Sequence, residues 1–251
     1  MLVIKAGGSV ITRKGGRPAF DRTAAARLAR ALARLRGPFA LVHGTGSYGK
    51  PPAVRYNYLS GRIAPGTAPV AAIKASLLEL HSLFISQLAA AGLRPVSCPG
   101  CACFSLAGGR PRLTAAPALK GWLGRGFTPV INSDIFMSGA GFRVVSSDAL
   151  AAALAAALRP ELAVFLTDVP GLLDPDGALQ PELSRAGFRA LARDIGAPRS
   201  DVSGGMAGKA REIARILAAG VDAAVLDGRR PEELLKLRAG RRAGGTYIHA
   251  R

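Results

Sequence analysis

The sequence lacks long hydrophobic runs. Although 49% of the 251 residues are hydrophobic, no uninterrupted apolar stretch reaches the roughly eighteen residues that a membrane-spanning helix needs. Residues 1–5 enter a strand-like run directly, without the layout of a signal peptide. These absences predict a soluble, cytoplasmic protein with no membrane partner. With no repeat and no linker, the hydrophobic content suffices for one domain spanning residues 1–251.

Cysteine is scarce as well, and its three copies are clustered. Cys98, Cys101 and Cys103 could seed a metal site only if a fourth ligand came from elsewhere in the chain. Their spacing is more typical of small apolar residues near the end of a strand, so we expect no zinc site. The sequence leaves the role of these cysteines open.

Acidic residues are few, 16 against 34 lysines and arginines, which gives a formal net charge of +18. Such a charge raises the possibility of nucleic-acid binding, because basic side chains release counterions from a phosphate backbone. Only seven of the basic residues are lysines, however, and arginines are spread along Ala- and Leu-rich stretches such as residues 23–36. This pattern favours a basic solvated surface that attracts small anions. Nucleic-acid binding is therefore the distant alternative.

Short apolar runs rich in β-branched residues alternate with longer helical stretches. The runs predicted as buried strands are residues 2–5, 39–43, 95–98, 129–132, 163–167 and 223–226. The predicted helices are residues 21–35, 70–91, 115–125, 147–158, 207–219 and 231–238. This rhythm predicts an α/β fold with a mostly parallel sheet covered on both faces, and small hairpins at 104–112 and 136–145.

Two glycine-bearing loops follow the first two predicted strands. The first is Lys5-Ala6-Gly7-Gly8-Ser9, with Lys14 shortly after it; paired glycines let backbone N–H groups approach phosphate oxygens. The second, His43-Gly44-Thr45-Gly46-Ser47-Tyr48-Gly49-Lys50, fits the G-x-G-x-x-G pattern of dinucleotide-binding proteins. A Rossmann dehydrogenase also needs an acidic residue about twenty positions later, but none occurs between Asp21 and Glu79. A phosphate-holding loop fits better.

Two further loops follow later strands. Thr167-Asp168-Val169-Pro170-Gly171 fits either turn chemistry or nucleotide contact. Asp201-Val202-Ser203-Gly204-Gly205-Met206-Ala207-Gly208-Lys209 leads into a helix and is no Walker A motif, yet its glycines and lysine suit an anion site. Phosphoryl transfer needs mainly lysines, backbone amides and magnesium around a positioned donor and acceptor. A Ser-His-Asp hydrolase is disfavoured, because no G-x-S-x-G motif accompanies the three histidines.

Taken in order, these motifs and the terminal Gly245-Thr246-Tyr247-Ile248 resemble the amino acid kinase superfamily, and within it the isopentenyl phosphate kinases. The resemblance runs nearly end to end. It implies a three-layer αβα sandwich, a homodimer, and a kinase that uses ATP and Mg²⁺. It also implies a small anionic substrate, with isopentenyl phosphate as the best single guess. Another small phosphate, phosphonate or carboxylate acceptor is the alternative.

The resemblance also implies roles for individual residues. The catalytic residues would be Lys5, Lys14, Lys209 and Asp148, with Asp148 organising the lysines. ATP would contact Lys5, Gly7, Gly8, Ser9, Gly46, Asp168, Gly205 and Lys209. The acceptor would contact Thr45, Gly46, Lys50 and Ser147. No protein residue is assigned to the metal.

Three positions depart from the isopentenyl phosphate kinase pattern, and all three are on the acceptor side. Lys50 replaces the usual histidine of the glycine loop, Thr45 replaces a glycine, and Ser147 also stands where the family has glycine. A lysine is a permanent point charge, and the hydroxyls add polarity and volume. We therefore expect an acceptor that is more polar or more highly charged than isopentenyl phosphate. A pocket for a prenyl tail is predicted from residues 73–88 and the strand near Val96.

Overall fold

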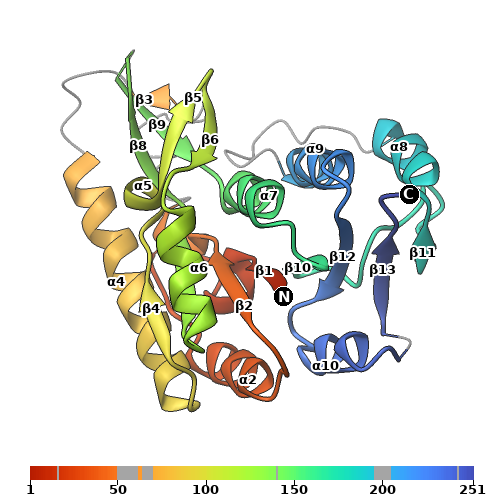
Figure 1. Ribbon diagram of the computed structural model, residues 1–251, viewed down its shortest axis with the longest axis horizontal. Coiled ribbons are helices and arrows are strands. Elements are labelled where there is room, and N and C mark those ends of the chain that lie inside the picture. The colour runs from red at the N-terminus through yellow and green to blue at the C-terminus, as the bar shows by residue number, and fades with distance from the viewer. Residues whose placement is uncertain (16, 50–61, 64–69, 140, 195–204, 242) are drawn as a thin grey trace.

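The computed structural model describes residues 1–15, 17–49, 62–63, 70–139, 141–194, 205–241 and 243–251 (Figure 1). Its strands are β1 (Leu2–Ala6), β2 (Phe39–His43), β3 (Arg62–Ile63), β4 (Pro95–Ser97), β5 (Phe104–Ala107), β6 (Arg110–Leu113), β7 (Thr128–Asn132), β8 (Asp134–Ser138), β9 (Gly141–Val145), β10 (Leu162–Thr167), β11 (Glu182–Leu183), β12 (Asp222–Asp227) and β13 (Gly245–Ile248). Its helices are α1 (Gly8–Ile11), α2 (Arg22–Ala33), the 3₁₀ turn η1 (Gly46–Tyr48), α4 (Val70–Ala90), α5 (Gly100–Cys103), α6 (Ala116–Gly124), α7 (Ser147–Leu158), α8 (Arg185–Asp194), α9 (Gly205–Ala218) and α10 (Glu232–Arg238).

The central sheet has eight strands in the order β11-β13-β12-β10-β1-β2-β7-β4. Every neighbouring pair is parallel except β12 and β13. The predicted mostly parallel sheet is confirmed, and each of the six predicted strands and six predicted helices forms within a few residues of its expected bounds. The elements that were not predicted include α1, α5, β11 and β13, which are too short for periodicity, and α8, whose pattern is interrupted by Gly187.

Because side chains alternate along each strand, the sheet has one hydrophobic core on each of its faces. In β1, Ile4 joins a cluster with Leu28 of α2, Phe84 of α4 and Leu234 of α10. Val3, one residue earlier, joins the opposite cluster with residues of α6, α7, α8 and α9. Helices α2 and α10 accordingly lie across the strands from α7 and α9 (Figure 1). The result is the expected three-layer αβα sandwich.

The parallel strands β1, β2 and β10 end at one edge of the sheet. Ala6 is in register with His43 of β2 and with Leu166 of β10, so the loops that follow these strands meet. The two predicted hairpins form as β5–β6 and β8–β9, and the second joins β3 in a three-stranded sheet. Both hairpins lie on the side of the molecule where α7 begins (Figure 1). No helix in the described part of the chain is long and apolar enough to cross a membrane.

Candidate active site

A cavity of about 1090 Å³ opens at the edge where these strands end. It is lined by the two glycine loops, the first turns of α7 and α9, and both hairpins. Every predicted site residue that the structure describes lies in this lining: Lys5, Gly7, Gly8, Ser9, Lys14, Thr45, Gly46, Ser147, Asp148, Asp168, Gly205 and Lys209. Lys50 lies outside the described residues. One cavity thus unites motifs that are up to about two hundred residues apart in the sequence.

The two glycine loops press against each other, backbone to backbone. A Cβ built on Gly8 would lie 2.1 Å from the backbone nitrogen of Gly46, and Gly46 itself has a φ of +48°. The hydroxyl of Thr12 donates to the carbonyl oxygen of Gly8 at 2.8 Å and accepts the N–H of Ser47 at 3.1 Å. Thr12 therefore clamps the loops together. Glycine is required here because a side chain would force the loops apart.

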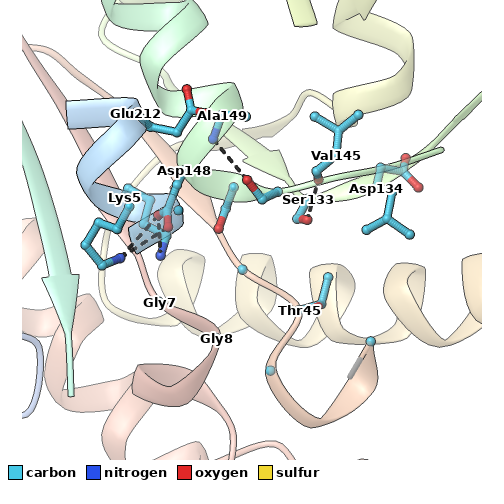
Figure 2. Close-up of a pocket in the computed structure, with 18 of the residues that line it drawn as sticks. Lys5, Gly7, Gly8, Thr45, Ser133, Asp134, Val145, Asp148, Ala149 and Glu212 are labelled. Carbon is cyan, nitrogen blue, oxygen red and sulfur yellow. Dashed lines mark hydrogen bonds and ion pairs between the residues drawn. The ribbon is translucent and has the colours of Figure 1, made fainter. Parts of the chain in front are cut away.

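At the centre of the site, one buried carboxylate holds two buried lysines. Lys5 Nζ lies 2.7 Å from Asp148 Oδ1, and Lys209 Nζ lies 3.2 Å from Asp148 Oδ2. Alternation in β1 turns Lys5 to the same face as Val3, the face that α7 and α9 cover. Figure 2 shows Lys5 beside Asp148, with Gly7 and Gly8 on the loop below and Thr45 on the neighbouring loop.

The cluster shifts the pKa of its members. Burial alone would raise the pKa of Asp148, but the attraction of Lys5 and Lys209 outweighs burial and lowers it to about 2. Burial lowers the pKa of Lys5 to about 8, although Asp148 counteracts part of that effect. The carboxylate is therefore ionised near neutral pH. Two ammonium groups that share one carboxylate leave a formal charge of +1 that faces the cavity.

Lys14 is held differently from the other two lysines. Its Nζ lies 3.0 Å from Asp168 Oδ2, and its side chain is 83% exposed. Burial would raise the pKa of Asp168, but the hydrogen bond and charge of Lys14 outweigh it and lower the pKa. Asp148 thus organises Lys5 and Lys209 but does not contact Lys14. A solvent-exposed ion pair of this kind is weak, and Lys14 can exchange its partner at little cost.

On the other side of Asp148 the cavity has an apolar wall. Ile73 and Leu77 of α4, Ile135 of β8 and Val144 of β9 line it. The prediction that α4 supplies this wall is confirmed. The prediction that the strand near Val96 also supplies it is wrong: β4 is the edge strand beyond β7, so Val96 packs instead against the core on the α7 face.

Polar groups adjoin the apolar wall. Thr45 and Ser147 line the cavity, and Ser147 Oγ lies 3.2 Å from the position that a Cβ on Gly44 would occupy. Asp134, which is buried, also lines it and accepts a hydrogen bond from Lys74 Nζ at 2.8 Å. The acceptor-side wall therefore combines apolar area with hydroxyls and a neutralised carboxylate.

A family model described as the amino acid kinase family matches residues 1–227. The chain belongs to the amino acid kinase family. It is 33% identical to an isopentenyl phosphate kinase of Haloferax volcanii over 99% of this chain and 98% of that protein. It is 28% identical to the enzyme of the same name from Methanothermobacter thermautotrophicus, again over 99% and 98%.

The fold comparison agrees with the sequence comparison. The crystal structure of the Thermoplasma acidophilum isopentenyl phosphate kinase product complex superposes with a TM-score of 0.78 at 24% identity, covering 99% of this chain and all of the other. The resemblance inferred from the motifs is therefore confirmed, and this member of the amino acid kinase family is a small-molecule kinase.

Sequence reasoning missed a buried chain of hydrogen bonds behind the second glycine loop of this kinase. His43 Nδ1 lies 3.0 Å from the carbonyl oxygen of Gly44, His43 Nε2 lies 2.8 Å from His81 Nδ1, and His81 Nε2 lies 2.9 Å from Ser97 Oγ. Because a carbonyl only accepts, Nδ1 of His43 carries the proton, Nδ1 of His81 donates to His43, and the Ser97 hydroxyl donates to His81. Burial lowers the pKa of His43 to about 3 and that of His81 to about 4, so both rings are neutral.

This chain links the glycine loop to α4 and β4. His43 and His81 are 1% and 2% exposed, and their rings stack with centroids 5.1 Å apart. The spacing of His81 on α4, in line with the buried residues Leu77 and Phe84, was a signal that it faces the core. Its partner could not be identified without the tertiary structure.

Proposed function

We propose that this kinase transfers the γ-phosphoryl group of ATP to the phosphate of isopentenyl phosphate, giving isopentenyl diphosphate and ADP. The observation that carries the proposal is the buried Lys5–Asp148–Lys209 cluster beside two clamped glycine loops, in a cavity whose other wall is apolar. The named relatives that match over nearly their full length support the same acceptor.

The donor side fits ATP. Gly8 and Ser9, at the start of α1, offer backbone N–H groups to phosphate oxygens, and Lys5 and Lys209 offer charge; the N–H of Gly7 instead donates to the carbonyl oxygen of Leu166 at 2.8 Å. Gly205 begins α9 and Asp168 directly follows β10, and both residues line the cavity. We assign no side chain to Mg²⁺, because this ion is commonly held by substrate phosphates and water with only one or two carboxylates. When bound, it supplies further neutralisation of the donor phosphates.

The chemistry needs little from the protein beyond position and charge. An oxygen of the acceptor phosphate attacks the γ-phosphorus, the bond from γ-phosphorus to the β,γ-bridging oxygen breaks, and ADP leaves with the bond electrons. Lys5 and Lys209 stabilise the negative charge on the oxygens of the transferred group. Lys14, released from its exposed bridge with Asp168, can approach the same group from solvent.

The acceptor would lie between the glycine loop and the apolar wall. Thr45, Gly46 and Ser147 would contact its phosphate end, with Lys50, outside the described residues, as the fourth proposed contact. The C5 tail would pack on Ile73 and Ile135. This arrangement buries the apolar tail and leaves the phosphate facing the charged cluster.

A second candidate keeps the kinase and changes the acceptor. The buried Asp134 and the partly exposed Lys74 form an ion pair next to the apolar wall, and Thr45 and Ser147 add hydroxyls. These groups favour a small phosphate or phosphonate that carries a polar substituent. A kinase for a carboxylate acceptor is the remaining alternative within the same fold. We further propose that the protein works as a cytoplasmic homodimer. Size-exclusion chromatography with light scattering tests the oligomeric state.

The test is ADP release from ATP and Mg²⁺ with a panel of acceptors: isopentenyl phosphate, dimethylallyl phosphate, fosfomycin, glutamate and carbamate. We expect turnover on isopentenyl phosphate that is lost in Lys209→Ala. Turnover only on fosfomycin or a carboxylate would refute the named acceptor and leave the kinase. A gel-shift titration over salt would detect the distant alternative, since nucleic-acid binding to a basic surface weakens steeply with salt.

A further inference from the structure

Two arginines without an assigned role project from the hairpins into the cavity. Arg110 is in β6 and Arg143 is in β9, and both line the cavity. We propose that they form an anion-binding pair that contacts the phosphate of the acceptor. This inference rests on the proposed function, because it takes the acceptor to be a phosphate ester.

The two hairpins bring these side chains to one place. Nη1 of Arg143 lies 2.5 Å from the position that a Cβ on Gly109 would occupy, so its guanidinium lies directly on the turn of the β5–β6 hairpin. Gly109 has a φ of +74° and immediately precedes Arg110. A residue with a side chain at position 109 would displace Arg143. The guanidinium of Arg143 therefore lies next to the residue that precedes Arg110 in the chain.

Neither arginine has a counter-charge in the part of the chain that the structure describes. The carboxylates that line the same cavity are already paired with other cations: Asp134 with Lys74, Asp148 with Lys5 and Lys209, Asp168 with Lys14, and Glu212 with Arg215. Because both guanidinium groups line one cavity, their positive charges repel each other, and an anion bound between them would remove that repulsion. Guanidinium groups also match phosphate geometry through two parallel N–H···O bonds.

The packing of the hairpins indicates which ligand they serve. β8 packs against α4 and α5, and β6 packs against α7; the principal neighbours of β6 and β8 do not include α9, which carries Lys209. Arg143 is in β9, the strand that also contributes Val144 to the apolar wall. The arginines thus lie on the acceptor side of Asp148. An acceptor phosphate would be held between Arg143 and Arg110 on one side and the Lys5 cluster on the other.

The experiment replaces each arginine by methionine, which keeps the length of the side chain and removes the charge. In Arg143→Met and Arg110→Met we expect the KM for isopentenyl phosphate to rise tenfold or more, with the KM for ATP within twofold of the wild-type value. Arg112→Met is the matched control, because Arg112 lies two residues along the same strand, is exposed and does not line the cavity. An unchanged acceptor KM in both test variants, or an equal rise in the KM for ATP, would overturn the proposal.

A binding measurement separates this proposal from the proposed function. Inorganic phosphate is titrated calorimetrically into wild type and Arg143→Met, with the donor site saturated by a non-hydrolysable ATP analogue and Mg²⁺. A Kd for phosphate at least tenfold weaker in the variant supports the arginine pair even if isopentenyl phosphate is not turned over. Equal Kd values, or no phosphate binding to wild type, refute it even if isopentenyl phosphate is a good substrate.

Discussion

Replacing Asp148 by asparagine tests the centre of the site, because it removes one charge and almost no volume. Asp148 is 6% exposed, and its two lysine partners lower its pKa from 3.8 to about 2. At about 1.4 kcal/mol per pKa unit, this shift corresponds to about 2–3 kcal/mol of interaction with the ionised carboxylate. Because the folded pKa is depressed, the contribution is complete above pH 4 and is lost as pH falls toward 2. We expect Asp148→Asn to lower the free energy of unfolding by about that amount at pH 7.

For a chain of this size, the loss corresponds to a decrease of about 5–10 °C in Tm. The activity should change in a second way. Asp148 counteracts the effect of burial on Lys5, whose pKa is about 8, so removing the carboxylate lowers that pKa further. Protonated Lys5 is the form that neutralises phosphate, and kcat/KM for ATP should fall as pH rises through about 8 in wild type and at lower pH in the variant.

The measurements are thermal unfolding and the pH profile of kcat/KM, with Asp176→Asn as the control. Asp176 is exposed in a turn, and its carboxylate has no ion-pair partner among the described residues. If Asp148→Asn unfolded within 2 °C of wild type and kept the same alkaline limb in its pH profile, Asp148 would neither stabilise the fold nor hold Lys5 in its protonated form.

Three more perturbations follow from the geometry. Gly8→Ala places a Cβ 2.1 Å from the backbone nitrogen of Gly46, so we expect kcat/KM to fall about a hundredfold with an unchanged circular dichroism spectrum. Near-normal turnover would show that the close contact of the two loops is not needed for catalysis. His81→Leu leaves His43 without its buried partner and should cost about 1–3 kcal/mol in urea unfolding. The free energy of unfolding of the wild type should also decrease as pH falls from 6.5 to about 4. In that range the imidazoles of the unfolded chain bind protons, whereas the folded ones stay neutral because their pKa values are lowered. The decrease should be smaller in His81→Leu, which has lost one of the two imidazoles. Lys14→Met should leave Tm within 2 °C but lower kcat at least tenfold, whereas an unchanged kcat would remove Lys14 from the proposed mechanism.

The position of the site could be predicted from the sequence because it depends on strand order alone. Parallel strands end at one edge, so any glycine loop that follows β1 or β2 must lie there. The orientation of Lys5 also follows from alternation with Val3 and Ile4. Local patterns were enough to find the loops, the lysines and the hairpins.

What the sequence could not provide is how separate elements meet. Lys5, Asp148 and Lys209 come from three distant elements, and only the family resemblance connected them before the structure did. The wall formed by Ile135 and Val144 depends on how the β8–β9 hairpin packs on α4, and hydrophobicity alone pointed instead to an edge strand. Contacts of this kind are set by tertiary packing, which no local pattern encodes.

Part of the net positive charge of the chain lies inside the cavity. Eight basic and four acidic side chains line it, so part of the excess that suggested a polyanionic partner is concentrated inside a recess of about 1090 Å³. A recess with one sign of charge and low-dielectric walls attracts small anions strongly, because it focuses the field where a duplex cannot enter. That volume is slightly above the range of roughly 300–1,000 Å³ for single-ligand pockets, which suits a donor and an acceptor bound together. Attraction of two anionic substrates requires more positive charge than either one alone. The shared carboxylate of Asp148, which leaves two lysines only half neutralised, supplies that charge where the two substrates would meet.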